Sequence, residues 1–183
     1  MAVRPVAFYA VSDSAHFIGL VALVNSLRLA GHTEPLLVAD CGLEDWQRRL
    51  LAPHADVRAM SKGALPHLQK GVLPLEESAS VMVLMDADLI VLQSLAPLLD
   101  EAAKGRVVVF ADPVSHRFDS RWAELLNLSA VRRQPYVNSG LMILPGSVGR
   151  RFLQAFAERR PAVDHHRSRL AGSTPHEPFY YVD

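Results

Sequence analysis

The chain alternates between short apolar segments and longer segments in which apolar residues recur every three or four positions. The short segments have the length and composition of strands, and they predict strands at residues 5–11, 35–40, 56–60, 81–92, 106–112 and 136–144. The longer segments have helical spacing, and they predict helices at residues 14–32, 43–51, 64–73, 95–105, 120–128 and 147–160. Ser14 and Ser147 are the expected N-caps, and Gly31 and Pro74 the expected helix ends.

Strands that alternate with helices in this way favour an α/β fold. We expect a mostly parallel central sheet with helices on both faces. No linker, repeat or low-complexity tract divides residues 1–183, so the sequence predicts a single domain. Ligands of such sheets bind where the strands end, at the carboxyl edge, and candidate chemistry is therefore sought directly after each apolar segment.

Composition and charge narrow the classes of function. The 19 basic and 19 acidic residues of the 183-residue chain cancel, which argues against general nucleic-acid binding. The longest apolar run, residues 17–24, is far too short to cross a bilayer, and we expect a cytoplasmic protein. Contact with a membrane surface is left open. Cys41 is the single cysteine, so neither an intrachain disulfide nor a cysteine metal site is expected.

Two aspartates, Asp86 and Asp88, follow the apolar segment VMVLM directly. In an extended chain their side chains would share one face, with Cα atoms about 6.5–7 Å apart. Two carboxylates this close resist joint ionisation, and a divalent cation removes the conflict. Hard oxygen ligands suit Mg²⁺ or Mn²⁺, which in turn can bind phosphate oxygens.

Three interpretations of the pair remain open at this point. The two carboxylates could simply cap a helix or bind backbone amides. They could belong to a phosphatase of the haloacid dehalogenase type, although that motif normally ends the first strand of its domain. They could also bind the diphosphate of a nucleotide sugar through a metal ion.

Several segments, in order along the chain, resemble the GT-A-fold glycosyltransferases, especially glycosyltransferase family 8. VMVLMDADLIVLQSL is similar to the D-x-D region of that family, and VAFYAVSDSAHFIGLVALVNSL to its first strand, nucleotide loop and long helix. LPHLQKGVLP, VVVFADP, PYVNSGLMIL and EPFYYVD resemble further family segments. The resemblance implies a metal-dependent, retaining hexosyltransferase that uses a UDP-hexose donor and a glycan, lipid or small-molecule acceptor.

The resemblance also implies a role for each matching residue. Asp86 and Asp88 would hold Mn²⁺ or Mg²⁺, and Asp86 would also reach the nucleotide ribose. Further donor contacts are implied for five residues: Ser12 and Asp13 at the base and ribose, Lys70 at the diphosphate or sugar, and Asn138 and Gly140 in the sugar pocket. The implied catalytic carboxylates are Asp112, in the sugar pocket, and Asp183, near the reacting carbon.

Each of these residues also has a purely structural interpretation. Ser12 and Asp13 could cap the first helix, and Lys70 could be a solvated lysine. Residues 138–140 could form a bend in a strand, and Asp112 could be a turn residue before Pro113.

The match is incomplete at the C-terminal end. In the family a histidine downstream of the position of Asp183 completes the metal site, whereas His165, His166 and His176 all precede it. We therefore expect a chain that is shortened relative to the family. A non-catalytic nucleotide-sugar-binding or interaction domain with the same fold is the alternative function.

Overall fold

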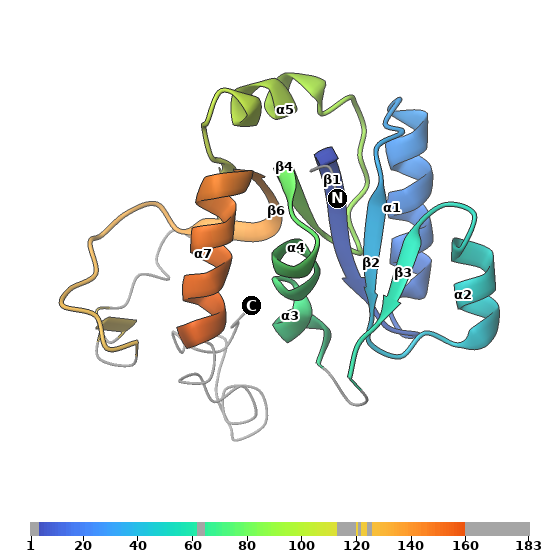
Figure 1. The fold of residues 1–183 in the computed structure, drawn as a ribbon, viewed down its shortest axis with the longest axis horizontal. Helices are drawn as coiled ribbons and strands as arrows, with labels where there is room; N and C mark the ends of the chain where they lie inside the picture. Colours follow the sequence, from blue (N-terminus) through green and yellow to red (C-terminus); the bar gives the residue numbers. More distant parts are fainter. Residues whose placement is uncertain (1–3, 62–64, 113–119, 121, 124–125, 160–183) are drawn as a thin grey trace.

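The computed structural model describes residues 4–61, 65–112, 120, 122–123 and 126–159. Six strands form one sheet in the order β3-β2-β1-β4-β6-β5 (Figure 1). The strands are β1 Arg4–Ser12, β2 Leu36–Asp40, β3 Asp56–Ala59, β4 Ala79–Asp86, β5 Val108–Ala111 and β6 Val137–Pro145. Strands β3, β2, β1 and β4 pair in parallel, whereas β6 runs antiparallel to both β4 and β5. The predicted α/β fold with a mostly parallel sheet is confirmed.

Helices cover both faces of this sheet. They are α1 Phe17–Leu29, α2 Asp45–Leu51, α3 Pro66–Gln69, α4 Val72–Glu76, α5 Ala96–Ala103 and α7 Gly146–Arg159. In the described part of the chain, no helix combines the length and apolar composition that crossing a bilayer requires.

The side chains of β4 alternate between two hydrophobic cores, one on each face. Val83 and Met85 enter the core shared with α1, α2 and α5, and Met82 and Leu84 enter the core shared with α4 and α7. All four are at most 1% exposed. Burial on both faces explains why the sequence of β4 reads as continuously apolar. Helix α7 lies close to the sheet because Gly149 has no side chain where it meets Met82 and Leu144.

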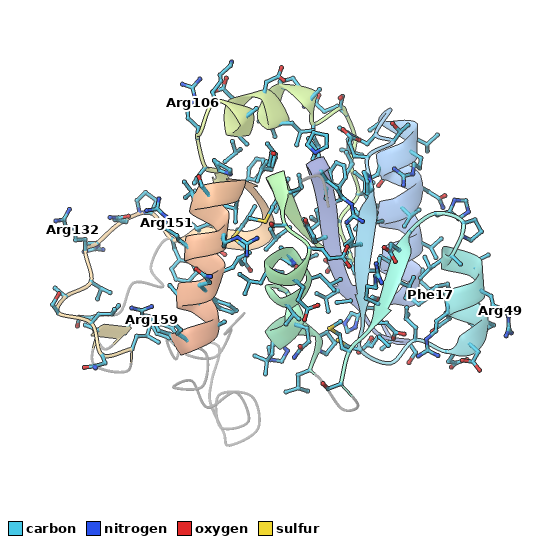
Figure 2. All side chains as sticks on the ribbon, viewed as in Figure 1. Phe17, Arg49, Arg106, Arg132, Arg151 and Arg159 are labelled. Carbon is cyan, nitrogen blue, oxygen red and sulfur yellow. The ribbon has the colours of Figure 1, made fainter. Side chains whose placement is uncertain are left out.

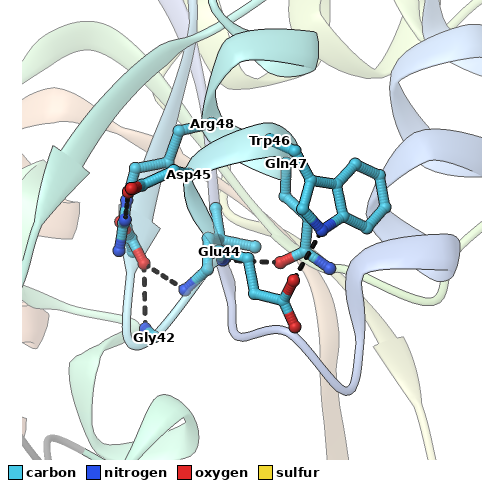
Figure 3. Close-up of polar contacts among 8 residues, drawn as sticks. Gly42, Glu44, Asp45, Trp46, Gln47 and Arg48 are labelled. Carbon is cyan, nitrogen blue, oxygen red and sulfur yellow. Dashed lines mark hydrogen bonds and ion pairs between the residues drawn. The ribbon is translucent and has the colours of Figure 1, made fainter.

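Helix α2 begins with a capping box. The side chain of Glu44 accepts a hydrogen bond from the backbone of Gln47, and Gln47 Oε1 accepts one from Glu44 N at 2.8 Å (Figure 3). Beside it, the buried carboxylate of Asp40 at the end of β2 accepts hydrogen bonds from Leu43 N and from Arg48 Nε, each at 2.6 Å. These contacts fix the β2–α2 connection.

Several predicted boundaries were wrong. Helix α1 begins after Asp13 and His16, and Ser14 is not its cap. Ser147 lies one residue inside α7, which begins at Gly146. Pro74 lies within α4 rather than ending a helix, because the third residue of a helix needs no N–H for an internal hydrogen bond. Gly31, with φ of 87°, does end α1 as predicted.

The segment 81–92 is not one strand. Strand β4 ends at Asp86, whose register partner on β1 is Val11, one residue before β1 itself ends. The last pairs of β4 are Asp86 with β1 and Met85 with β6, and beyond them Ile90 and Leu92 are 63% and 90% exposed. The helix predicted at 120–128 lies partly outside the described residues.

Several arginines lie on the surface of the described part of the chain. Arg49 and Arg132 are exposed, at opposite sides of the view in Figure 2. Arg151 is also exposed, on α7. Arg49 and Arg132 therefore do not belong to one basic patch.

Candidate functional site

The polar residues of interest gather where the parallel strands end. Ser12 of β1 is in register with Asp40 of β2. On the other side of β1, Asp86 of β4 is in register with Val11, the residue before Ser12. Because β6 is antiparallel, it begins at this same edge, where Leu141 is in register with Met85. The reversed direction of β6 therefore brings residues 138–140 beside Asp86.

An ion pair forms the centre of this edge. Lys70 Nζ lies 2.6 Å from Asp86 Oδ1, and it also donates to Ser139 O at 3.0 Å and to Ser139 Oγ at 3.3 Å. The Lys70 side chain is 13% exposed and that of Asp86 37%. Lys70 is thus not a solvated lysine, and it joins the end of helix α3 to strands β4 and β6.

A cavity of about 410 Å³ opens beside this pair. Its polar lining comes from Asp13, His16, His67, Lys70, Asp86 and Asp88. The structure therefore places three predicted donor-site residues and the second aspartate of the D-x-D pair around one space, which has the size of a small-molecule site.

The two aspartates are not both in the strand. Asp86 is the last residue of β4, and Ala87 and Asp88 form a turn that leaves Asp88 exposed. The predicted extended geometry was wrong here, although both aspartates line the same cavity. Helix α1 packs directly against this turn at Gly19. A Cβ atom on Gly19 would lie only 2.8 Å from Ala87 O, so the close contact depends on the glycine.

Asp13 has two contacts in the loop before α1. Its Oδ1 accepts a hydrogen bond from His16 N at 3.0 Å and lies 2.7 Å from His16 Nδ1. Burial on its own would raise the pKa of Asp13, but the contacts with His16 together hold that pKa below its usual value. Asp13 thus binds the backbone of His16, the residue before α1, whereas no side chain caps the helix itself, and the carboxylate also faces the cavity.

The start of β6 approaches the aspartate closely. A Cβ atom on Gly140 would lie 3.2 Å from Asp86 Oδ2 and 2.8 Å from Asn138 Oδ1, which accepts a hydrogen bond from Gly140 N. Asn138 Nδ2 in turn donates to Asp112 Oδ2 at 3.4 Å. A chain of contacts thus leads from Asp86 to Gly140, from Gly140 to Asn138, and from Asn138 to Asp112.

Of the predicted site residues within the described ranges, Ser12, Asp112, Asn138 and Gly140 do not line this cavity. Ser12 is fully buried, and its hydroxyl donates to Asp13 O at 3.2 Å. Asp183 lies outside the described residues, as do His165, His166 and His176. The role predicted for Asp183 stays a prediction.

Three polar cavity or contact residues were missed by sequence reasoning, namely His16, His67 and Ser139. His16 lines the cavity and is positioned by Asp13, and the i, i+3 spacing after a strand end was the available signal. Ser139 binds Lys70, but its partner is 69 positions away along the chain, and no local pattern connects the two.

The donor set fits a hard divalent cation that completes its coordination with a ligand. Within the described ranges, no group of three or more histidine, cysteine or acidic residues could hold a metal ion on its own. Mg²⁺ and similar ions commonly bind one or two carboxylates, with water and substrate phosphates filling the other positions. Asp86 and Asp88 offer two such carboxylates on one cavity.

A larger cavity, of about 750 Å³, lies at the far edge of the sheet beside β2, β3 and α2. Its charged groups already have partners: Arg48 binds Asp40, and Arg28 donates to the backbone oxygens of His32 and His54. We therefore place the candidate site at the smaller cavity, where the acidic residues converge.

Comparison with solved structures identifies proteins of similar fold. The galactosyltransferase LgtC, in complex with donor and acceptor sugar analogs, shares 15% identity, with a TM-score of 0.59 over 87% of this chain and 66% of its own. The bifunctional glycosyltransferase WbbM shares 15% identity, with a TM-score of 0.58 over 85% of this chain and 35% of its own. The glycosyltransferase GlyE of Streptococcus pneumoniae TIGR4 shares 12% identity, with a TM-score of 0.54 over 90% of this chain and 41% of its own.

The chain has the fold of these glycosyltransferases. It spans between about a third and two thirds of the length of the solved chains that it matches. No protein-family model matches the sequence, and no curated protein matches it either. At this level of identity the likeness concerns the fold, and function is argued from the site.

Proposed function

We propose that this chain is a glycosyltransferase of the family 8 type, which transfers a hexose from a UDP-hexose to an acceptor hydroxyl. The observation that carries the proposal is the Lys70–Asp86 ion pair, at 2.6 Å, on the same cavity as Asp13 and Asp88. A cation and several carboxylates at the carboxyl edge of the sheet suit a diphosphate that binds together with a divalent ion. The fold shared with solved glycosyltransferases supports the same assignment.

The chemistry follows from the charge that develops when the sugar–phosphate bond breaks. The departing diphosphate gains negative charge, and Mn²⁺ or Mg²⁺ held by Asp86 and Asp88 would stabilise it. Lys70 would place a second cation on the same oxygens. One pair of unit charges 4 Å apart contributes about 4 kcal/mol at an effective dielectric constant of 20. If it acts only in the transition state, that energy corresponds to roughly a thousandfold in rate.

The other residues would bind and orient the donor. Asp13 lies at the end of the cavity formed by the loop after β1, where the base and ribose would bind. Asn138, Gly140 and Asp112 lie beside Asp86 and would line the sugar pocket. We propose retention of the anomeric configuration on the resemblance to family 8, and the described residues identify no nucleophile.

A non-catalytic donor-binding domain is the second candidate. The observation that favours it is the Lys70–Asp86 ion pair, because Lys70 neutralises the carboxylate that a metal-dependent transferase would use for the cation. Transfer or hydrolysis of a UDP-sugar by the chain would contradict this alternative.

Calorimetric titration with UDP, in the presence and absence of Mn²⁺, tests the proposal. We expect binding that strengthens when Mn²⁺ is added, and we expect Asp88→Asn to lose that dependence. Asp100→Asn is the matched control, because Asp100 is an exposed aspartate on α5, away from the cavity. UDP binding that is absent under both conditions would contradict the proposal.

A further inference from the structure

Each N–H group of the Lys70 ammonium already has an acceptor in the structure. An ammonium group has three N–H donors. In the structure they face three acceptors within 3.3 Å, namely Asp86 Oδ1, Ser139 O and Ser139 Oγ. Lys70 therefore cannot donate to a phosphate oxygen without giving up one of these contacts.

The contact most readily exchanged is the one with Asp86. The two acceptors on Ser139 belong to strand β6, which is held between β4 and β5. The carboxylate of Asp86 is the more exposed partner, with its side chain 37% accessible and facing the cavity. A phosphate oxygen in that cavity could replace Asp86 Oδ1 while Lys70 keeps its contacts with Ser139.

A divalent cation at Asp86 would share its carboxylate with Lys70, because both oxygens belong to one negative charge that Lys70 already neutralises at 2.6 Å. A cation bound to Oδ1 at about 2.1 Å would stand within about 5 Å of Lys70 Nζ if the ion pair stayed in place. Two positive ions that close repel each other strongly in a partly buried site.

We infer that Lys70 is an exchangeable counter-ion of Asp86, so that Lys70 and a divalent cation compete for the Asp86 carboxylate until a diphosphate binds Lys70. The inference rests on the proposed donor site and adds a coupling within it. Without a diphosphate, Lys70 lowers the affinity for the cation. With a diphosphate, Lys70 moves to the phosphate oxygens and the cation binds Asp86 and Asp88 freely. By reciprocity, the nucleotide and the cation raise each other's affinity by the same factor.

Electron paramagnetic resonance of free Mn²⁺ measures the competition directly in the full chain, with no nucleotide added. Lys70→Met keeps a long side chain and removes the charge. We expect it to bind Mn²⁺ about 5- to 150-fold more tightly than the unchanged chain, which is the usual range of such couplings. The matched control is Lys104→Met at the C-terminal end of α5, where Lys104 pairs with Glu101 at 3.0 Å. We expect that control to leave Mn²⁺ affinity unchanged. A merely structural role for Lys70 would not produce tighter metal binding.

Addition of UDP provides the second arm. UDP should raise the Mn²⁺ affinity of the unchanged chain and raise that of the Lys70→Met variant by a smaller factor. Lys70→Gln repeats both arms with a polar side chain, and circular dichroism verifies folding of each variant. Should neither variant fold, the unchanged chain decides alone, because equal Mn²⁺ affinity with and without bound UDP would overturn the inference.

The outcomes separate the inference from the proposed function. Unchanged or weaker Mn²⁺ binding in the folded Lys70 variants overturns the competition, even if UDP binds. The same holds if neither the unchanged chain nor the variants bind Mn²⁺. Tighter Mn²⁺ binding in the variants supports the competition, even if the absence of UDP binding contradicts the glycosyltransferase assignment.

Discussion

Gly19 of α1 lies directly against Ala87, the residue between the two aspartates of the D-x-D pair. A Cβ atom at Gly19 would come within 2.8 Å of Ala87 O and within 3.1 Å of Asp88 Cα. Both neighbours are backbone atoms, which cannot rotate out of the way as a side chain can. The first helix therefore sets the position of the turn between the two aspartates, although no residue of that helix belongs to the predicted site.

We expect Gly19→Ala to lower the free energy of unfolding by about 1–3 kcal/mol, because the backbone of the turn must shift to admit the methyl group. The same shift should weaken the Mn²⁺ dependence of UDP binding. Urea denaturation and calorimetry measure the two effects. Gly71→Ala is the control for stability, because its Cβ atom would meet only side-chain atoms at ordinary contact distances, Leu153 Cδ2 at 3.4 Å and Phe156 Cδ1 at 3.9 Å. Equal stability of the two variants would contradict the close contact at Ala87.

The buried carboxylate of Asp40 should contribute strongly to stability at neutral pH. It accepts hydrogen bonds from Arg48 Nε and from the amides of Gly42 and Leu43 (Figure 3). We expect Asp40→Asn to lower the free energy of unfolding by about 2–4 kcal/mol, because charge-assisted hydrogen bonds are lost inside the protein. Asp45→Asn removes an exposed partner of the same arginine, and it should cost less than about 1 kcal/mol.

The same carboxylate gives the stability a defined pH dependence. Burial on its own would raise the pKa of Asp40, but the hydrogen bonds from Arg48, Leu43 and Gly42 together hold the pKa below its usual value of 3.8. The ionised form is thus favoured in the folded protein. Its contribution is complete well above pH 3.8 and is lost as the pH falls through the folded pKa. Denaturation between pH 2 and 7 should show a smaller acid loss of stability in Asp40→Asn than in the unchanged chain.

Cys41 should react slowly with thiol reagents. Burial, followed by the charges of Asp40 and Asp13, raises the pKa of its thiol to about 11. At pH 8 about one thiol in a thousand would be ionised, against roughly a quarter for an ordinary cysteine. We expect alkylation by iodoacetamide to be about a hundredfold slower in the folded protein than in urea, and to accelerate until the pH approaches 11. A rate that levels off near pH 8.5 would contradict the shift.

The sequence was sufficient to predict the alternation of strands and helices because each strand and helix carries a local pattern. The continuous apolar run of β4 and the helical spacing of α7 are examples. It was also sufficient to place Asp13 and Asp86 at strand ends. The direction of β6 could not be predicted, because an apolar segment reads the same whether it pairs in parallel or antiparallel. That direction decides that Ser139 and Gly140, rather than Pro145, lie beside Asp86.

The turn at Asp88 shows a second limit. Residues 89–92 are as apolar as a strand, yet the chain turns at Ala87 and Asp88, directly after the last β4 pairs with β1 and β6, and leaves the sheet. Where a strand ends depends on the length of its partners, which the local sequence does not contain. The Lys70–Asp86 contact has the same origin, since it joins residues whose spacing of sixteen carries no periodic signal.

Asp13 offers a way to separate its structural role from the predicted contact with the nucleotide. Its carboxylate accepts a hydrogen bond from His16 N at the start of α1 and also lines the cavity. Asparagine can accept the same hydrogen bond from His16 N but carries no charge, whereas alanine neither accepts that hydrogen bond nor carries a charge. We expect Asp13→Ala to lower the free energy of unfolding by about 1 kcal/mol and Asp13→Asn to change it by less than about 0.5 kcal/mol. If the carboxylate binds the ribose or base, both variants should bind UDP about tenfold more weakly, because a hydrogen bond to a charged group is lost. If UDP affinity falls only in Asp13→Ala, the hydrogen bond to His16 N supports nucleotide binding and the charge of the carboxylate does not. Calorimetry and urea denaturation on the two variants therefore test the predicted role of Asp13 independently of its contribution to the helix.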